Sequence, residues 1–77
     1  MEQRVFEIVA QMASVDPTDI NRDSSMDNVE TWDSLVAINL VLALEEEFGV
    51  RFTDEQINQL SSVRAIMEAL QELVGQA

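Results

Sequence analysis

The chain has 77 residues and a formal net charge of −11, with 15 acidic residues, four arginines and no lysine. This composition argues against nucleic acid and anionic membranes as partners, because both require clustered basic residues. The absence of cysteine and histidine excludes disulfides, zinc–thiolate sites and the usual catalytic bases and nucleophiles. No stretch approaches the roughly 20 apolar residues of a membrane span, and the polar N-terminus shows no signal peptide. We therefore expect one cytoplasmic domain, residues 1–77, that does not catalyse alone.

The first predicted helix runs from Glu2 to about Ser14. Its apolar residues recur at helical spacing with polar residues between them, which indicates an amphipathic helix. Asp16-Pro17 ends the helix, because proline disfavours helical backbone at the residue before it. A long polar connection follows, roughly residues 15–33. A loop of this length in so small a domain is often functional.

The strongest helical pattern runs from Ser34 to about Phe48. Asp33 or Ser34 suits its N-cap, and Gly49 stands where a left-handed residue commonly ends a helix. The apolar side chains of this helix cover most of its circumference in two sectors. Either the helix is central and buries both sectors, or the second sector is an exposed contact surface beside Ser34. The first sector comprises Leu40, Val41, Leu44 and Phe48, and the second comprises Leu35, Ile38 and Leu42.

The remainder of the chain predicts a short helix and a last long one. Thr53 and Gln56 have the spacing of a capping box, which begins the short helix. The Ser61-Ser62 pair caps the last helix, and residues 75–77 are expected to form a frayed tail. The predicted fold class is all-α: a small four-helix bundle of three main helices and one short helix, with a long first loop.

The segment Trp32-Asp33-Ser34-Leu35, followed by Leu40-Val41-Leu42-Ala43-Leu44-Glu45-Glu46-Glu47-Phe48-Gly49, resembles the second helix of acyl carrier proteins. The resemblance covers nearly the whole chain, including its length, its acidity, the Asp16-Pro17 stop and the long first loop. Asp-Ser before an apolar helix is by itself an ordinary cap. The resemblance therefore depends on the residues around Asp33-Ser34-Leu35 and not on this tripeptide alone.

The resemblance implies that Ser34 carries a covalent 4′-phosphopantetheine arm, with Asp33 and Leu35 beside it at the cofactor site. A separate phosphopantetheinyl transferase would add the arm from coenzyme A, and the terminal thiol would hold acyl groups as thioesters. The chain would then be a monomeric carrier and not an enzyme, delivering acyl intermediates to enzymes of fatty acid, polyketide or related biosynthesis. The residues fit this role, because a helix N-terminus favours a phosphodiester and the chain holds no base to activate Ser34.

The resemblance also implies a partner-binding face on the same helix. Its apolar positions match those that contact partner enzymes in the family. Its acidic residues, together with Asp33, match carboxylates that contact arginine and lysine side chains of those enzymes. Such charged contacts predict fast, weak and salt-sensitive encounters. Alternatively, the acids from Glu45 to Glu47 have no partner-binding role and are the solvated end of the helix. The residues of this face are Ile38, Asn39, Leu42, Glu45 and Glu46, with Leu35 adjoining them.

The sequence departs from the family pattern at three positions. Val36 and Asn39 stand where fatty-acid-synthase carriers usually have acids, so the face is less acidic than is usual. Trp32 stands where the family often has a small residue. A tryptophan before Asp-Ser-Leu is similar to the motif of stand-alone carriers that serve specialised pathways such as polyketide assembly. The alternative explanation of Trp32 is packing at the corner between loop and helix.

A rival motif lies in the long loop. Its polar residues fall at positions 1, 3, 5, 7, 9 and 12 of an EF-hand-like calcium loop. However, Ser24 stands at position 6, where glycine is required, and Pro17 interrupts the incoming helix. The alternative function is an acidic calcium-binding or protein-interaction module, and a milder form is weak divalent binding that relieves charge repulsion. The loop residues are Asp19, Asn21, Asp23, Ser25, Asp27 and Glu30.

Overall fold

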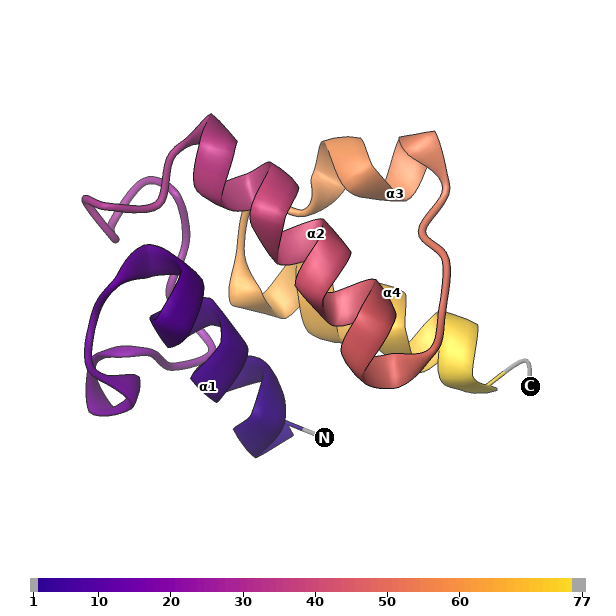
Figure 1. Ribbon diagram of the computed structural model, residues 1–77, viewed down its shortest axis with the longest axis horizontal. Coiled ribbons are helices and arrows are strands. Elements are labelled where there is room, and N and C mark those ends of the chain that lie inside the picture. The colour runs from indigo at the N-terminus through magenta and orange to yellow at the C-terminus, as the bar shows by residue number, and fades with distance from the viewer. Residues whose placement is uncertain (1, 76–77) are drawn as a thin grey trace.

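The computed structural model describes residues 2–75 of the chain. Within them it has four α-helices, one 3-10 turn and no strand, which confirms the all-α class and the four-helix bundle (Figure 1). None of the helices in this part of the chain has the length and apolar character to cross a membrane. Gly75, expected in a frayed tail, ends the last helix, and Gln76 and Ala77 lie outside the described residues. The elements are α1 (Glu2–Ala13), η1 (Pro17–Asp19), α2 (Ser34–Phe48), α3 (Asp54–Gln59) and α4 (Val63–Gly75).

The first helix, α1, ends one residue before the predicted boundary. Ser14 adopts a left-handed backbone with φ of 58°. The N–H of Val15 donates to the carbonyl of Ala10 at 2.9 Å, a hydrogen bond that commonly closes helices in this way. An Asp16 carboxylate oxygen then accepts the Thr18 N–H at 3.0 Å and caps η1. The chain therefore leaves α1 in a defined direction.

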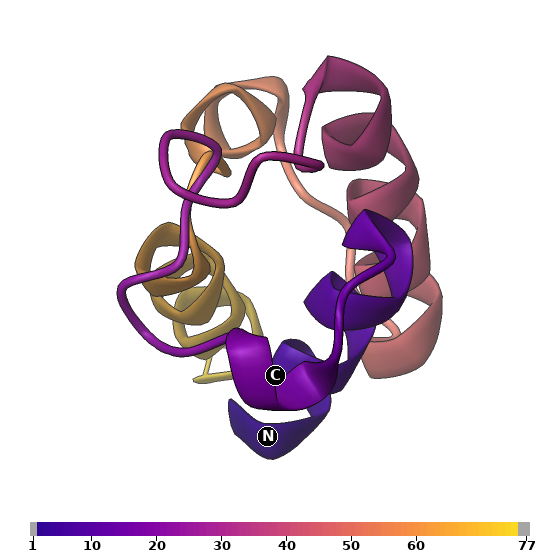
Figure 2. The ribbon, with the colours of Figure 1, turned by 90° about the vertical axis from the view of Figure 1, so that its left-hand side faces the viewer.

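The long connection between η1 and α2 is held by backbone contacts far along the chain. An isolated antiparallel bridge pairs Ser25 with Ser62, just before α4. Met26 N–H donates to the Ser61 carbonyl at 2.9 Å within this bridge. Figure 2 shows the loop crossing one end of the bundle, from α1 past α4 and α3 to the start of α2. The loop is thus anchored beside the start of α4 before the chain enters α2.

The helix α2 runs from Ser34 to Phe48, as the sequence predicts. Gly49 has φ of 64° and closes the helix in the left-handed conformation expected for it. The capping box before α3 is also present: Thr53 accepts the Gln56 N–H, and the Gln56 side chain accepts the Thr53 N–H. Ser62 caps α4 by accepting the Ala65 N–H at 3.1 Å. Local capping signals therefore set these helix boundaries.

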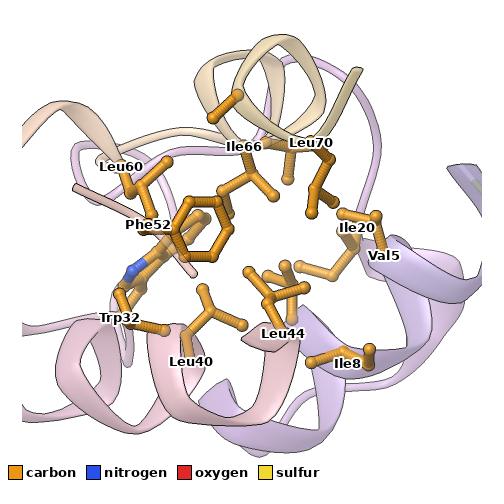
Figure 3. Packing of buried hydrophobic residues seen from close by; sticks show 14 of the residues in the cluster. Val5, Ile8, Ile20, Trp32, Leu40, Leu44, Phe52, Leu60, Ile66 and Leu70 are labelled. Atoms are coloured by element: carbon orange, nitrogen blue, oxygen red, sulfur yellow. The ribbon is translucent and has the colours of Figure 1, made fainter. Parts of the chain in front are cut away.

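One apolar cluster fills the space between the helices (Figure 3). Trp32 is only 2% exposed and lies beside Phe52 and Leu60 in this view, with its ring nitrogen on the side away from Leu44 and Leu70. The indole therefore joins the core at the corner between the loop and α2. The largest fully buried side chains are Trp32, Leu40, Leu44, Ile66, Leu70, Val5, Val9 and Val63.

Candidate functional site

Ser34 is the first residue of α2, and its side chain is exposed. The N-cap is Asp33 and not Ser34: an Asp33 carboxylate oxygen accepts the Val36 N–H at 2.9 Å. The Asp33 carbonyl accepts the first helical hydrogen bond, from Ala37 N–H, also at 2.9 Å. Within residues 2–75, no protein group hydrogen-bonds to the Ser34 hydroxyl. The cap therefore shapes the helix start without using Ser34 itself.

Trp32 holds this helix start in place from the other side. Its indole is buried in the core, and its backbone N–H donates to the Val29 carbonyl at 3.0 Å. The indole nitrogen is buried, and no group in the described part of the chain accepts its hydrogen. Two residues later the chain is fully at the surface, at Ser34. The packing explanation of Trp32 thus agrees with the structure: the buried indole and the backbone hydrogen bond of Trp32 anchor the chain two residues before the hydroxyl.

The second apolar sector of α2 is exposed. Leu35 is 66% exposed, and Ile38 and Leu42 are each 60% exposed. At about 100° per residue these side chains share one face of the helix that begins at Ser34. The alternative of a central helix is therefore wrong, because only the opposite sector enters the core. We call this face, with its three apolar side chains and Asn39, the α2 stripe.

The three acids at the end of α2 have three different environments. Glu45 is half-buried, and one of its carboxylate oxygens accepts the Phe52 N–H at 2.9 Å. Glu46 is exposed beyond the stripe. Glu47 pairs with Arg4 of α1, with 2.9 Å between Oε1 and Nη2. A solvated helix end therefore describes Glu46 alone, and nothing in the local sequence signals the contacts of the other two.

The hydrogen bond from Arg4 holds the pKa of the Glu47 carboxyl below its ordinary value. Because this pKa is lowered in the folded state, the stabilisation is present above the unfolded pKa, about 4.3, and is lost as the pH falls through the folded value. We expect Glu47→Gln to lower the melting temperature at pH 7 and to differ progressively less from wild type below about pH 4. Thermal melts followed by circular dichroism at several pH values measure this. A difference between the two proteins that grows as the pH falls is incompatible with the ion pair.

The candidate calcium loop uses its oxygens to close turns. Asn21 accepts the Asp23 N–H at 2.8 Å, and the Ser25 hydroxyl accepts the Asp27 N–H at 3.2 Å. Asp23 also pairs with Arg64 of α4, with 2.9 Å between oxygen and nitrogen. Across residues 2–75 there is no group of three or more histidine, cysteine or acidic residues placed to hold a metal ion. These contacts explain why Asn21, Asp23 and Ser25 are polar without a metal ion.

The start of α2 fits a phosphate ester on Ser34. The N–H groups of Ser34 and Leu35 precede the first helical hydrogen bond, and in the described chain no acceptor is found for them. Such free amides and the helix dipole favour an anion at this end. The Asp33 carboxylate repels a second negative charge, but both groups are exposed, and the high dielectric constant of water keeps this repulsion small. The site can therefore present a hydroxyl to an outside base and hold the resulting ester.

Comparison with protein families finds a match to the phosphopantetheine attachment site family over residues 3–70. The chain is 38% identical over 74 residues to acyl carrier protein 2 of Pseudomonas aeruginosa, which covers 96% of this chain and 94% of that one. It is 36% identical over 73 residues to an acyl carrier protein of Thermosynechococcus vestitus, which covers 95% and 90% of the two chains.

Two solved structures share the fold. The holo acyl carrier protein of Geobacter metallireducens superposes with a TM-score of 0.84 at 21% identity, over 97% of this chain and 86% of that one. The oxytetracycline acyl carrier protein gives a TM-score of 0.76 at 22% identity, over 100% and 85%. At these identities the likeness concerns the fold alone.

Proposed function

The chain belongs to the acyl carrier protein family, and from this premise we propose that Ser34 is the residue that carries its 4′-phosphopantetheine group. Proteins of this family are carriers and not enzymes, and they hold the group covalently. The observation that carries the proposal is the exposed, unbonded hydroxyl of Ser34 at the first residue of α2.

The other serines support this choice by their own contacts. The hydroxyls of Ser24, Ser25 and Ser62 each accept a backbone N–H, so they close turns or cap a helix. Ser14 follows the end of α1, and Ser61 precedes the Ser62 cap. Within residues 2–75, Ser34 alone combines exposure, an unbonded hydroxyl and a helix N-terminus.

The residues around Ser34 would hold and orient the group without performing its chemistry. When bound, the group supplies a thiol on a long flexible arm, on which acyl groups are carried as thioesters. Asp33 caps the helix, and the free amides of Ser34 and Leu35 would stabilise the negative charge of the phosphate. The chain has no histidine, lysine or cysteine. The base that removes the Ser34 proton is therefore expected to come from the transferase.

We further propose that the α2 stripe is the surface on which partner enzymes bind, with Glu45 and Glu46 at its far end. A partner that covers one of the exposed apolar side chains gains about 1–2 kcal/mol from it, whereas an exposed ion pair contributes about 0–1 kcal/mol. The partners would be enzymes of fatty acid, polyketide or related biosynthesis. Val36 and Asn39 are neutral where carriers of fatty acid synthases usually have acids. We therefore expect this chain to serve a pathway other than ordinary fatty acid synthesis.

The proposal is tested by modifying the purified protein in vitro. The protein is incubated with coenzyme A, magnesium and a broad-specificity phosphopantetheinyl transferase, and its intact mass is then measured. We expect the wild type to gain the mass of one phosphopantetheinyl group and no more. A carrier protein of known competence serves as the positive control. If that control is modified and this chain is not, the proposed function is wrong.

A further inference from the structure

The part of the core that is nearest to Ser34 along the chain is filled by a large side chain. Trp32 precedes Ser34 by two residues, which span at most about 7 Å, and its indole is 2% exposed. Phe52 and Leu60 are also buried and lie beside it (Figure 3). Trp32 precedes α2, Phe52 precedes α3, and Leu60 follows α3. The three side chains therefore fill the interior between the segments that flank these two helices.

Backbone hydrogen bonds hold two of these residues in place. The Trp32 N–H donates to the Val29 carbonyl at 3.0 Å, and the Phe52 N–H donates to a Glu45 carboxylate oxygen at 2.9 Å. The indole nitrogen is buried and has no acceptor within residues 2–75, so the indole contributes volume to the core and not a hydrogen bond. A close-packed interior admits an extra group only by displacing side chains, which destabilises the fold. The space that the indole fills is therefore closed to a further apolar group.

Three hollows in the surface of the described chain lie away from this region. Their volumes are between about 100 and 360 Å³, and charged and amide side chains make up much of their linings. One lies at Arg22 and Arg64, one lies between α1 and α2, and one lies between α3 and α4. None of these three is lined by Ser34, Trp32 or Phe52. They offer no apolar space beside the start of α2.

We infer that Trp32 excludes the acyl group from the bundle, so that the cargo stays in solvent and is short or carries polar groups. The inference rests on the proposed attachment at Ser34 and names the class of acyl group. A long apolar chain in water forgoes the gain from burying each of its methylenes. Keto, hydroxyl or carboxyl groups keep their hydrogen bonds to water, and burying them would cost free energy. Trp32 is thus a specificity-determining residue for the cargo.

The test compares acyl groups of two lengths on the intact chain. A broad-specificity phosphopantetheinyl transferase loads the protein from acetyl-coenzyme A or octanoyl-coenzyme A. The Ser34 oxygen forms the phosphodiester, and adenosine 3′,5′-bisphosphate leaves. Intact mass verifies each product. The measured quantity is the melting temperature of the octanoyl form minus that of the acetyl form, followed by circular dichroism.

The informative variants reduce the volume of the side chain at Trp32. Trp32→Leu leaves an apolar cavity, and a dry apolar cavity of about 150 Å³ is large enough to bind a benzene molecule. Trp32→Phe leaves a smaller space and serves if the leucine variant does not fold. The matched control is Leu70→Ala, because Leu70 is fully buried but lies across the core from Trp32 (Figure 3).

We expect the octanoyl group to raise the melting temperature of Trp32→Leu by about 4–8 °C over the acetyl form, because burial of even one or two methylenes has such an effect on a domain of this size. Trp32→Phe should give a smaller rise in the same direction. The wild type and Leu70→Ala should change by less than about 2 °C, since neither offers the chain a space beside the start of α2.

Two results would overturn the inference. In the first, the wild type or Leu70→Ala gains as much from the octanoyl group as Trp32→Leu does, so the bundle takes in the chain with the indole present. In the second, neither variant at Trp32 gains anything, so the indole is not what keeps the chain out. Both results leave the proposed function intact, since the same samples have gained the acylated mass. A wild type that gains no mass from either acyl-coenzyme A contradicts the proposed function instead.

Discussion

Replacing Trp32 with alanine should lower the free energy of unfolding by about 3–5 kcal/mol. The indole is 2% exposed and packs beside Phe52 and Leu60, so its removal leaves a large cavity in the core (Figure 3). Small domains have little stability to spare, and a loss of this size unfolds a large fraction of the protein. Urea denaturation followed by far-ultraviolet circular dichroism measures the change without relying on the tryptophan signal.

The control for this variant is Trp32→Phe. Phenylalanine retains most of the apolar contact, and the indole nitrogen that it removes has no acceptor within residues 2–75. We therefore expect a loss of about 1–2 kcal/mol, well below that of the alanine variant. A loss under about 1 kcal/mol for Trp32→Ala would contradict the buried corner that positions Asp33 and Ser34.

Replacing Ser34 with alanine should abolish the mass gain in the modification reaction. The variant removes the hydroxyl oxygen to which the ester would be attached, so the expected effect is complete. The stability should change by less than about 0.5 kcal/mol, because the side chain is exposed and Asp33 provides the cap. Intact-mass spectrometry and urea denaturation of the same preparation separate the two effects.

Ser61→Ala is the matched control for this variant. Ser61 is also exposed, but it lies before the Ser62 cap of α4 and outside the α2 stripe. We expect this variant to gain the full mass of one group, at the wild-type rate. A mass gain that persists in Ser34→Ala, or that disappears in Ser61→Ala, assigns the attachment to another residue.

The boundaries of α2 and the start of α3 follow from local sequence. Asp33 and Gly49 flank an apolar run that has no competing break, and the observed helix has the predicted ends. Thr53 and Gln56 form their capping box within four consecutive residues. Such signals act between near neighbours, so they can be interpreted without knowing the tertiary structure.

The exposure of the second sector of α2 depends on tertiary packing. Leu35 and Leu40 are equally apolar in the sequence, but Leu40 is buried in the core and Leu35 is 66% exposed. The contact from Arg4 to Glu47 spans 43 residues, and the Ser25–Ser62 bridge joins a loop to a distant turn. No local pattern encodes these contacts, because they form only when the helices are assembled. The proposed attachment of the group at Ser34 is implied by the resemblance to a family, whereas the exposure of the Ser34 hydroxyl is visible only in the folded chain.

The most direct test of the central claim locates the modification on the wild-type chain. Trypsin cleaves after Arg22 and Arg51 and so releases residues 23–51, which contain Ser24, Ser25 and Ser34. Fragment-ion mass spectrometry of this peptide, after reaction with coenzyme A and the transferase, distinguishes the three serine hydroxyls from one another and from the hydroxyl of Thr31. The account predicts the whole added mass on Ser34. Added mass on Ser24 or Ser25, or an unmodified peptide, would contradict it.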